Sequence, residues 1–190
     1  MSTTREFPQL ETERLVLREL TSADAEVISP NFADEEVVRY IDAKPVASIN
    51  DVAGIIDWGA SLLNSQTGNL WGIFRKEDGS FLGQVNYVVR PDNNFTGTMH
   101  RAEIGYNLAP HYWGNGYMSE AIRCVLDFVF SSTELNRIEA TVHTENNRSL
   151  NVLIRLGFYK EGILREYVQW GGGYWDMVLF SMLKTDWLNN

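Results

Sequence analysis

The chain has 190 residues, 44% hydrophobic and 12% aromatic, so it can fill one sizeable core, and we expect a single domain over residues 10–187. Its net charge of −9 opposes broad phosphate-backbone binding, and Cys124, the only cysteine, excludes an intrachain disulfide; no nucleic-acid partner is predicted. No run approaches the roughly 18 apolar residues of a membrane span, and the start MSTTREFPQLETERL lacks signal-peptide features, so we expect a cytoplasmic protein without membrane association.

The first half of the chain is predicted to pass from one strand through two helices into three strands. In residues 13–19, Leu15 and Leu17 alternate with Val16 and Arg18, which is consistent with a strand. Thr21 or Ser22 can cap a helix over residues 23–29. Asn50 or Asp51 is expected to cap a second helix through Leu63. Period-two patterns then predict three successive strands, separated by the turn KEDGS and the loop PDNNFTGT: residues 70–75, 81–89 and 102–108.

The second half alternates helices and strands. Residues 117–130 carry apolar side chains on one face, which indicates an amphipathic helix, and residues 137–143 follow as a strand. Residues 147–155 have helical spacing and end before Gly157, a typical C-terminal cap. The tail LREYVQWGGGYWDMVLFSML reads as two strands joined at the triple glycine. This order predicts an α/β protein with a mixed sheet.

The stretch HYWGNGYMSEA, residues 111–121, places two glycines directly before a helix start. Glycines let backbone N–H groups converge, and a helix N-terminus adds partial positive charge, so the stretch suits a pyrophosphate. The alternative is a tight turn that packs a strand on a helix. A P-loop is excluded because no Gly-Lys-Ser/Thr follows, and a dinucleotide fingerprint is weak because Ser119 stands at its third glycine.

Four segments in order resemble the GNAT N-acetyltransferase family, and the resemblance spans residues 10–187. AEIGYNLAPHYWGNGYMSEA resembles the family's acetyl-CoA-binding motif, with His111 where Gln or Arg is usual, and ENNRSLNVLIRLGF resembles its later N-x-x-S motif. TERLVLREL and EGILREYVQWGGGYWDMVLFSML are similar to the branch of Rim-type ribosomal-protein N-terminal acetyltransferases. The resemblance implies that a primary amine attacks acetyl-CoA directly, without an acyl-enzyme.

The same resemblance implies a fold and a cosubstrate site. The expected fold is a twisted, mostly antiparallel sheet flanked by helices, in which the strands 102–108 and 137–143 splay apart. Backbone at Asn107 and Leu108 would pair with the pantetheine arm, and Asn146 would bond to it. Loop amides would hold the pyrophosphate of acetyl-CoA, from Trp113, Gly114, Asn115, Gly116, Tyr117 and Met118.

Two residues are candidates for proton transfer. Glu103 stands where one branch of the family has a general base, and the alternative is a structural carboxylate paired with Arg101 or another cation. Ser149 is the candidate acid for the departing thiolate, because Leu153 replaces the tyrosine that other branches have. The alternative for Ser149 is an ordinary hydroxyl at the start of a helix.

The amine acceptor is less well defined by the sequence. Tyr167, Trp170 and Tyr174, near the glycine hairpin, are the predicted acceptor contacts. The acidic run at residues 34–36 could attract a cationic acceptor or simply form a solvated helix face. The three histidines share no ligand spacing, so no metal is predicted. The expected acceptor is the N-terminus of a ribosomal or other protein.

Three alternatives to that function stay open. One is an acetyltransferase of a small amine, such as a polyamine, an antibiotic or a metabolite. A second is a sensor that binds acetyl-CoA without turnover, and a third, which rests only on the glycine loop, is a nucleotide-dependent enzyme. The chain is expected to be a monomer or a homodimer.

Overall fold

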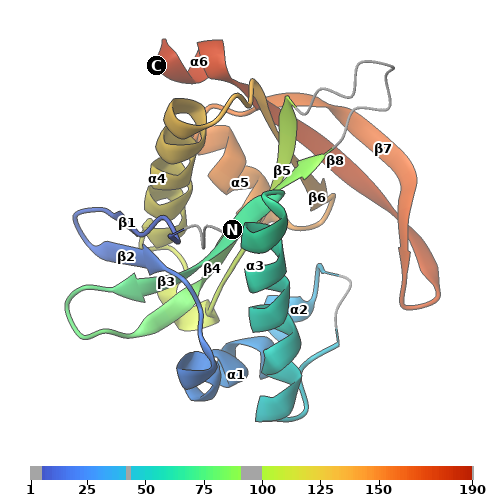
Figure 1. The fold of residues 1–190 in the computed structure, drawn as a ribbon. Coiled ribbons are helices and arrows are strands. Elements are labelled where there is room, and N and C mark those ends of the chain that lie inside the picture. Colours follow the sequence, from blue (N-terminus) through green and yellow to red (C-terminus); the bar gives the residue numbers. More distant parts are fainter. Residues whose placement is uncertain (1–5, 42–43, 91–99, 190) are drawn as a thin grey trace. The chain divides into compact units, whose positions relative to one another are not determined.

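The structure is a computed structural model that describes residues 6–41, 44–90 and 100–189 (Figure 1). The chain groups into two compact units: residues up to Val88 with Gly105–Val125, and Val89–Ile104 with the residues from Leu126 onward. We call them unit 1 and unit 2. The single domain over residues 10–187 stays a prediction, and the loop PDNNFTGT lies outside the described residues.

Unit 1 contains the first strands of the sheet. β1 (Leu10–Glu11), β2 (Leu15–Arg18), β3 (Gly68–Arg75) and β4 (Phe81–Arg90) pair antiparallel in that order. β5 (Arg101–Leu108) is next to β4, and its residues 105–108 belong to unit 1. The predicted strands are confirmed, whereas β1 was missed because two residues carry no periodic signal. Gly83 permits a close approach of β4 to β5, since a Cβ there would lie 2.2 Å from the carbonyl oxygen of Asn107.

Two helices of unit 1 follow capped 3₁₀ turns. Thr21 and Asp24 form a capping box at η1 (Ser22–Asp24), which leads into α1 (Ala25–Ala33) and the short α2 (Glu35–Val38). The predicted cap of the next helix was wrong by one turn. Ser48 caps η2 (Ile49–Val52), and Asp51 is its capping-box partner, accepting from the N–H groups of Ala47 and Ser48, before α3 (Ala53–Ser65) begins.

One hydrophobic core joins these helices to β3 and β4. It is built from Ile28 and Phe32 of α1, Leu62 of α3, and strand residues that include Leu70 and Phe74. Figure 1 shows α1, α2 and α3 gathered beside this part of the sheet. At about 25 cal/mol per Å² of buried apolar surface, burial of this cluster stabilises unit 1.

Unit 2 contains the last strands of the chain. β5 pairs parallel with β6 (Arg137–His143), and β8 (Gly173–Leu183) pairs antiparallel with both β6 and β7 (Tyr159–Trp170). The β5–β6 ladder covers only the pairs from Arg101 to Glu103 on β5, although both strands run on. Figure 1 shows β7 and β8 as a long, curved hairpin, closed by Gly171 and Gly172, both with positive φ as a two-residue turn requires.

Three helices complete the described chain. α4 (Tyr117–Ser132) is the predicted amphipathic helix, and its apolar face is buried from Met118 to Phe130. α5 (Asn147–Arg155) matches its prediction, and Gly157 ends it with φ of 84°. The short α6 (Lys184–Leu188) was not predicted. Among the described residues, no helix combines the length and the hydropathy needed to cross a membrane.

Candidate active site

The loop between β5 and α4 has the backbone conformation that its glycines predict. Gly114 and Gly116 have φ of 80° and 79°, in the left-handed region that other residues enter only with strain. A Cβ on Gly114 would meet no atom within 4 Å, so these glycines serve the turn itself rather than a close contact. The side-chain amide of Asn115 donates to the carbonyls of Tyr112 and Trp113 and so fixes the loop from within.

The loop presents a row of unengaged backbone donors. Within the part of the chain that the structure describes, no group accepts a hydrogen bond from the N–H of residues 114–119. The N–H of Trp113 is already bonded to the carbonyl of Pro110, at 3.1 Å, in η3 (Pro110–Tyr112). Six amides at the start of a 16-residue helix can therefore bind an anion, and Trp113 is not one of these donors.

Glu120, in the first turn of α4, forms an ion pair with Arg14, for which no role was predicted. The Glu120 carboxylate accepts from Thr12 Oγ1 at 2.5 Å, from the Arg14 backbone N–H at 3.0 Å and from Arg14 Nε at 2.7 Å. Burial favours the neutral form of Glu120, but these hydrogen bonds outweigh it, and its pKa lies below the usual value.

Arg14 also contacts the loop itself. Its Nη1 donates to the carbonyl of Asn115 at 3.1 Å, and its guanidinium lies over the Tyr117 ring at 4.4 Å. A Cβ on Gly116 would lie 3.6 Å from Arg14 Nη2. The side chain is 42% exposed, so its charge stays accessible beside the unengaged amides. The sequence did hold one indication of such a cation. Glu120 places a negative charge at the start of a helix that was expected to bind an anion, and that charge needs a cationic partner.

A second arginine lies on the same side of the loop. The guanidinium of Arg75 lies 5.4 Å from the centre of the Tyr112 ring, and it interacts with the Tyr117 hydroxyl. Arg75 is held by Asp78, to whose Oδ1 its Nε donates at 2.9 Å, and this partner raises the pKa of Arg75. The loop is thus bordered by two guanidinium groups, each with its own carboxylate partner.

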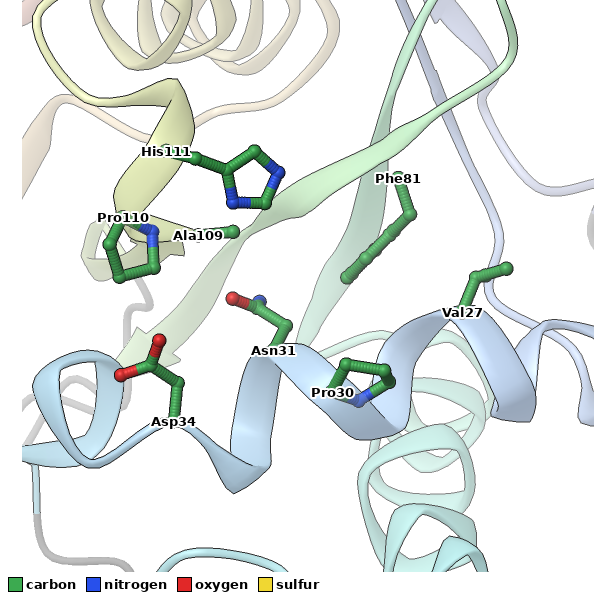
Figure 2. A pocket seen from close by; sticks show the side chains of 8 residues that line it. All are labelled: Val27, Pro30, Asn31, Asp34, Phe81, Ala109, Pro110 and His111. Carbon is green, nitrogen blue, oxygen red and sulfur yellow. The ribbon is translucent and has the colours of Figure 1, made fainter.

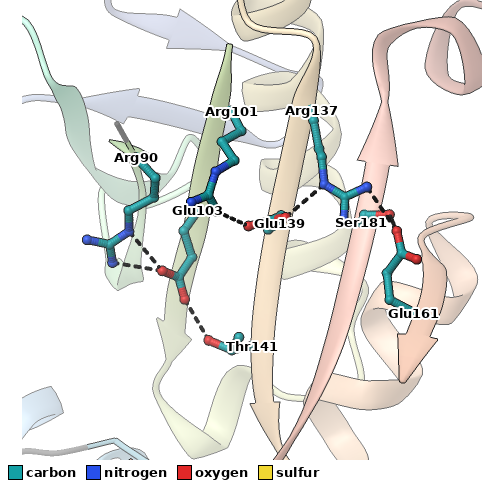
Figure 3. Close-up of polar contacts among 8 residues, drawn as sticks. All are labelled: Arg90, Arg101, Glu103, Arg137, Glu139, Thr141, Glu161 and Ser181. Atoms are coloured by element: carbon teal, nitrogen blue, oxygen red, sulfur yellow. Dashed lines mark hydrogen bonds and ion pairs between the residues drawn. The ribbon is translucent and has the colours of Figure 1, made fainter. Parts of the chain in front are cut away.

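The predicted base Glu103 is fully engaged by its neighbours in unit 2 (Figure 3). Its Oε2 accepts from Arg90 at 3.0 and 2.7 Å, and its Oε1 accepts from the Thr141 hydroxyl at 2.6 Å. The cation paired with Glu103 is therefore Arg90, while Arg101 pairs with Glu139 across the ladder at 2.8 Å. Glu103 is a partly exposed carboxylate whose two oxygens already accept hydrogen bonds.

A separate row of charges begins at Glu139, the residue opposite Glu103 on β6, and crosses the strands of unit 2. Glu139 is bonded to both Arg101 and Arg137, and Arg137 reaches Glu161 of β7 at 2.9 Å. The Ser181 hydroxyl donates to Glu161 at 2.6 Å, as Figure 3 shows. These contacts link side chains of β5, β6, β7 and β8, while Glu103 itself is held by Arg90 and Thr141.

Ser149 and Asn146 form the start of α5. Asn146 is the N-cap, and its Oδ1 accepts from the Ser149 N–H at 3.1 Å. The side-chain Nδ2 of Asn146 has no partner among the described residues, so this group can still donate to a ligand. Ser149 lies in the first turn of α5. This position is compatible both with a role as proton donor and with an ordinary hydroxyl at a helix start.

The end of β5 is fixed by Trp113. The indole N–H of Trp113 donates to the carbonyl of Leu108 at 2.7 Å, so this carbonyl is already bonded. The Asn107 side chain accepts from Asn31 of α1 at 2.9 Å. The Asn107 side chain is thus committed within unit 1, and a ligand would have to use the backbone here.

A family model described as an acetyltransferase (GNAT) domain matches residues 14–159. The chain belongs to the GNAT acetyltransferase family. It is 38% identical to the uncharacterized N-acetyltransferase YoaA of Bacillus subtilis (strain 168) over 178 residues, which cover 94% of this chain and 98% of the relative. The chain is accordingly an acetyl-CoA-dependent N-acetyltransferase.

Solved structures share this fold. The ribosomal-protein-S5-alanine acetyltransferase from Vibrio fischeri has a TM-score of 0.80 at 26% identity, covering 95% of this chain and 98% of that chain. A ribosomal L7/L12 α-N-protein acetyltransferase, solved in complex with coenzyme A, has a TM-score of 0.81 at 18% identity, covering 93% and 98%. The predicted mixed α/β fold, with its mostly antiparallel sheet, is confirmed.

In this acetyltransferase the three predicted acceptor residues do not share one face of the β7–β8 hairpin. Trp170 is opposite Gly173, and its ring lies 6.5 Å from Trp175 and 6.0 Å from the buried His143. Tyr174 pairs with Gln169, the neighbour of Trp170, so its side chain lies on the opposite face of the hairpin from Trp170. Strand alternation places Tyr167 on the same face as Tyr174. Tyr167 and Tyr174 are exposed, whereas Trp170 packs in an aromatic cluster. Within the described ranges, no group of three or more His, Cys, Asp or Glu side chains is arranged to hold a metal.

Proposed function

We propose that this acetyltransferase transfers the acetyl group of acetyl-CoA to the α-amine at the N-terminus of a protein. The observation that supports this acceptor is the engagement of Glu103 by Arg90 and Thr141. An α-amine with a pKa of about 8 loses its proton at pH 7 for about 1.4 kcal/mol, whereas lysine, at about 10.4, costs roughly 4.5 kcal/mol. A carboxylate held by an arginine suits the acceptor that needs less help from a base.

The proposed cosubstrate site is the loop described above. The amides of Gly114, Asn115, Gly116, Tyr117 and Met118 would donate to the pyrophosphate, with the guanidinium of Arg14 beside them. Trp113 would act by holding the loop, through its bonds to Pro110 and Leu108, rather than by donating its own amide. Backbone at Asn107 and Leu108 would pair with the pantetheine arm, and the Asn146 Nδ2 would donate to it.

The proposed proton transfers use residues of unit 2. As the amine nitrogen bonds to the thioester carbon, Glu103 would take the amine proton, directly or through a water, and the carbon–sulfur bond would break. Ser149 would donate a proton to the departing thiolate. Because a thiolate with a pKa near 8.5 leaves readily, Ser149 is expected to matter less than the positioning of the amine. Tyr167, Trp170 and Tyr174 are the proposed contacts of the acceptor chain.

The similar structure from Vibrio fischeri, at 26% identity, is an acetyltransferase of ribosomal protein S5, which supports the same acceptor class. The test is a set of peptides assayed with labelled acetyl-CoA. One peptide has a free α-amine and no lysine, a second has a blocked N-terminus and one lysine, and small amines complete the set. We expect label on the α-amine, located by mass spectrometry.

Three other outcomes would overturn this acceptor assignment. Label only on lysine would make Glu103 the base for a harder acceptor, and label only on polyamines or aminoglycosides would make the enzyme a small-amine acetyltransferase. Acetyl-CoA binding without turnover on any amine would indicate a sensor. Calorimetry with coenzyme A, ATP and NAD distinguishes the cosubstrate from a nucleotide.

A further inference from the structure

A cavity of about 280 Å³ lies in unit 1, between α1 and the end of β5 (Figure 2). Its walls are mainly apolar: Val27, Pro30, Phe81, Ala109 and Pro110. Three polar side chains complete the lining, from Asn31, Asp34 and His111. All of these residues belong to unit 1, so the cavity is formed without unit 2.

Asn31 is the unusual member of this lining. The residue is buried, with 5% of its surface exposed, and its Nδ2 donates to Asn107 Oδ1 at 2.9 Å. Its Oδ1 is covered and has no hydrogen-bond partner among the described residues. Figure 2 shows the amide rising from α1 toward Ala109 and Pro110. A buried acceptor without a donor costs about 1–3 kcal/mol, so this position favours a ligand that can donate.

Asp34 adds a negative charge to the same cavity. It follows α1 and caps α2, and its Oδ1 accepts from the Glu36 N–H at 2.8 Å. Its Oδ2 has no partner within the described ranges, and Figure 2 shows the carboxylate turned toward the cavity. Of the acidic run at residues 34–36, Asp34 is therefore the member that lines a cavity, while Glu36 pairs with Arg39 on the surface.

We propose that this cavity binds a small primary amine in its protonated form. An amide oxygen and a carboxylate oxygen are both acceptors, and an ammonium group carries three N–H donors and the opposite charge to Asp34. The apolar walls would cover a short hydrocarbon body. Because Asn31 Oδ1 is covered, binding requires a small rotation of its amide or a small outward movement of the wall.

The size of the cavity limits the ligand. Sites for drug-sized molecules begin near 300 Å³, so about 280 Å³ fits a compact molecule rather than a peptide. The proposal does not rest on acetyl transfer or on the pyrophosphate loop. The predicted binding of the amine to this cavity is therefore independent of whether acetyl-CoA is bound at the loop.

The test is titration of the whole protein, without acetyl-CoA, with butylamine and with 1-butanol, followed by calorimetry or ligand-observed NMR at pH 7. Both probes donate to an oxygen, but only butylamine carries a charge. We expect butylamine to bind at least tenfold more tightly. Asp34→Asn keeps a capping oxygen for Glu36 and removes the charge, so it should lower the affinity for butylamine at least fivefold and leave that for 1-butanol unchanged.

A matched control is Asp51→Asn, which removes the same charge from a capping aspartate of unit 1 that does not line the cavity. It should leave both affinities unchanged. Asn31→Leu should weaken both probes; if that variant fails to fold, Asp34→Asn alone decides. The proposal is overturned if the parent protein binds no butylamine at millimolar concentration, or if Asp34→Asn and Asp51→Asn behave alike. Coenzyme A titrated into the same samples reports on the proposed function separately.

Discussion

The guanidinium of Arg14 bonds to the carboxylate of Glu120 and to the carbonyl of Asn115, which ties the turn before β2 to the first turn of α4. A carboxylate at a helix N-terminus is favourable for the helix but repels a second anion. Arg14 cancels that repulsion at the place where six amides are free to bind one. The loop is thus a site whose charge is set by a residue about 100 positions away in the sequence.

Arg14→Gln is expected to raise the KM for acetyl-CoA about 5- to 20-fold, because the variant leaves the Glu120 charge next to the pyrophosphate site. The KM for S-acetylpantetheine, which lacks the pyrophosphate, should not change. Arg39→Gln, which breaks an exposed pair with Glu36, is the control and should affect neither donor. Equal losses with both donors would mean that Arg14 acts only on folding.

Glu120→Gln is expected to destabilise the protein by about 1–2 kcal/mol at pH 7, because the charged hydrogen bonds from Thr12 and Arg14 are weakened. The pKa of Glu120 is lowered in the folded state, so its contribution is complete above its unfolded value of about 4.3 and is lost as the pH falls through the folded value. The gap between parent and variant in urea unfolding should therefore shrink below about pH 4. If the difference in unfolding free energy did not change with pH, the charge of Glu120 would not be the cause of the stabilisation.

Gly116→Ala and Gly79→Ala form a matched pair. Both glycines have positive φ, 79° and 71°, and a Cβ on either meets no atom within 3.5 Å, so each substitution should cost about 1 kcal/mol of backbone strain. Only Gly116→Ala should also weaken coenzyme A binding, by about tenfold or more, because it disturbs the row of amides. Similar binding by the two variants in calorimetry would count against the loop as the pyrophosphate site.

Glu103→Gln should lower kcat about 100-fold for a lysine acceptor and less than tenfold for an α-amine, since the lysine needs more help to lose its proton. The control is Glu139→Gln, a carboxylate directly opposite on β6 that is bonded to Arg101 and Arg137. It should affect stability but not the ratio of the two rates. Unchanged rates for both acceptors in Glu103→Gln would assign the residue a structural role.

Most helices and strands were predictable because their signals are local. The spacing of apolar residues predicted the helices over 117–130 and 147–155, and the structure confirms both. The turn between the last two strands is confirmed at Gly171 and Gly172. The cap at Ser48 was missed because a 3₁₀ turn precedes α3, and the apolar periodicity begins only after that turn. The loop conformation followed from the positions of Gly114 and Gly116.

The partners of the candidate site residues were not predictable, because they come from distant strands. Which arginine would pair with Glu103 depends on how β4 and β5 are aligned, and Arg90 rather than Arg101 is the answer. The bond between Arg14 and Glu120 joins residues 106 positions apart. Asn31 and Asp34 gave no sign of a cavity, since periodicity does not report which polar groups a fold buries.

The family model begins at residue 14, but unit 1 begins to pack before that point. Thr12 donates to Glu120, Glu11 pairs with Lys76, and the indole N–H of Trp71 donates to the carbonyl of Pro8 at 2.6 Å. A chain shortened to begin at residue 14 would lose these three contacts together. One of them, from Thr12 to Glu120, is a contact of the first turn of α4. The affinity of a truncated protein for the thioester donor would therefore depend on whether these N-terminal residues are kept.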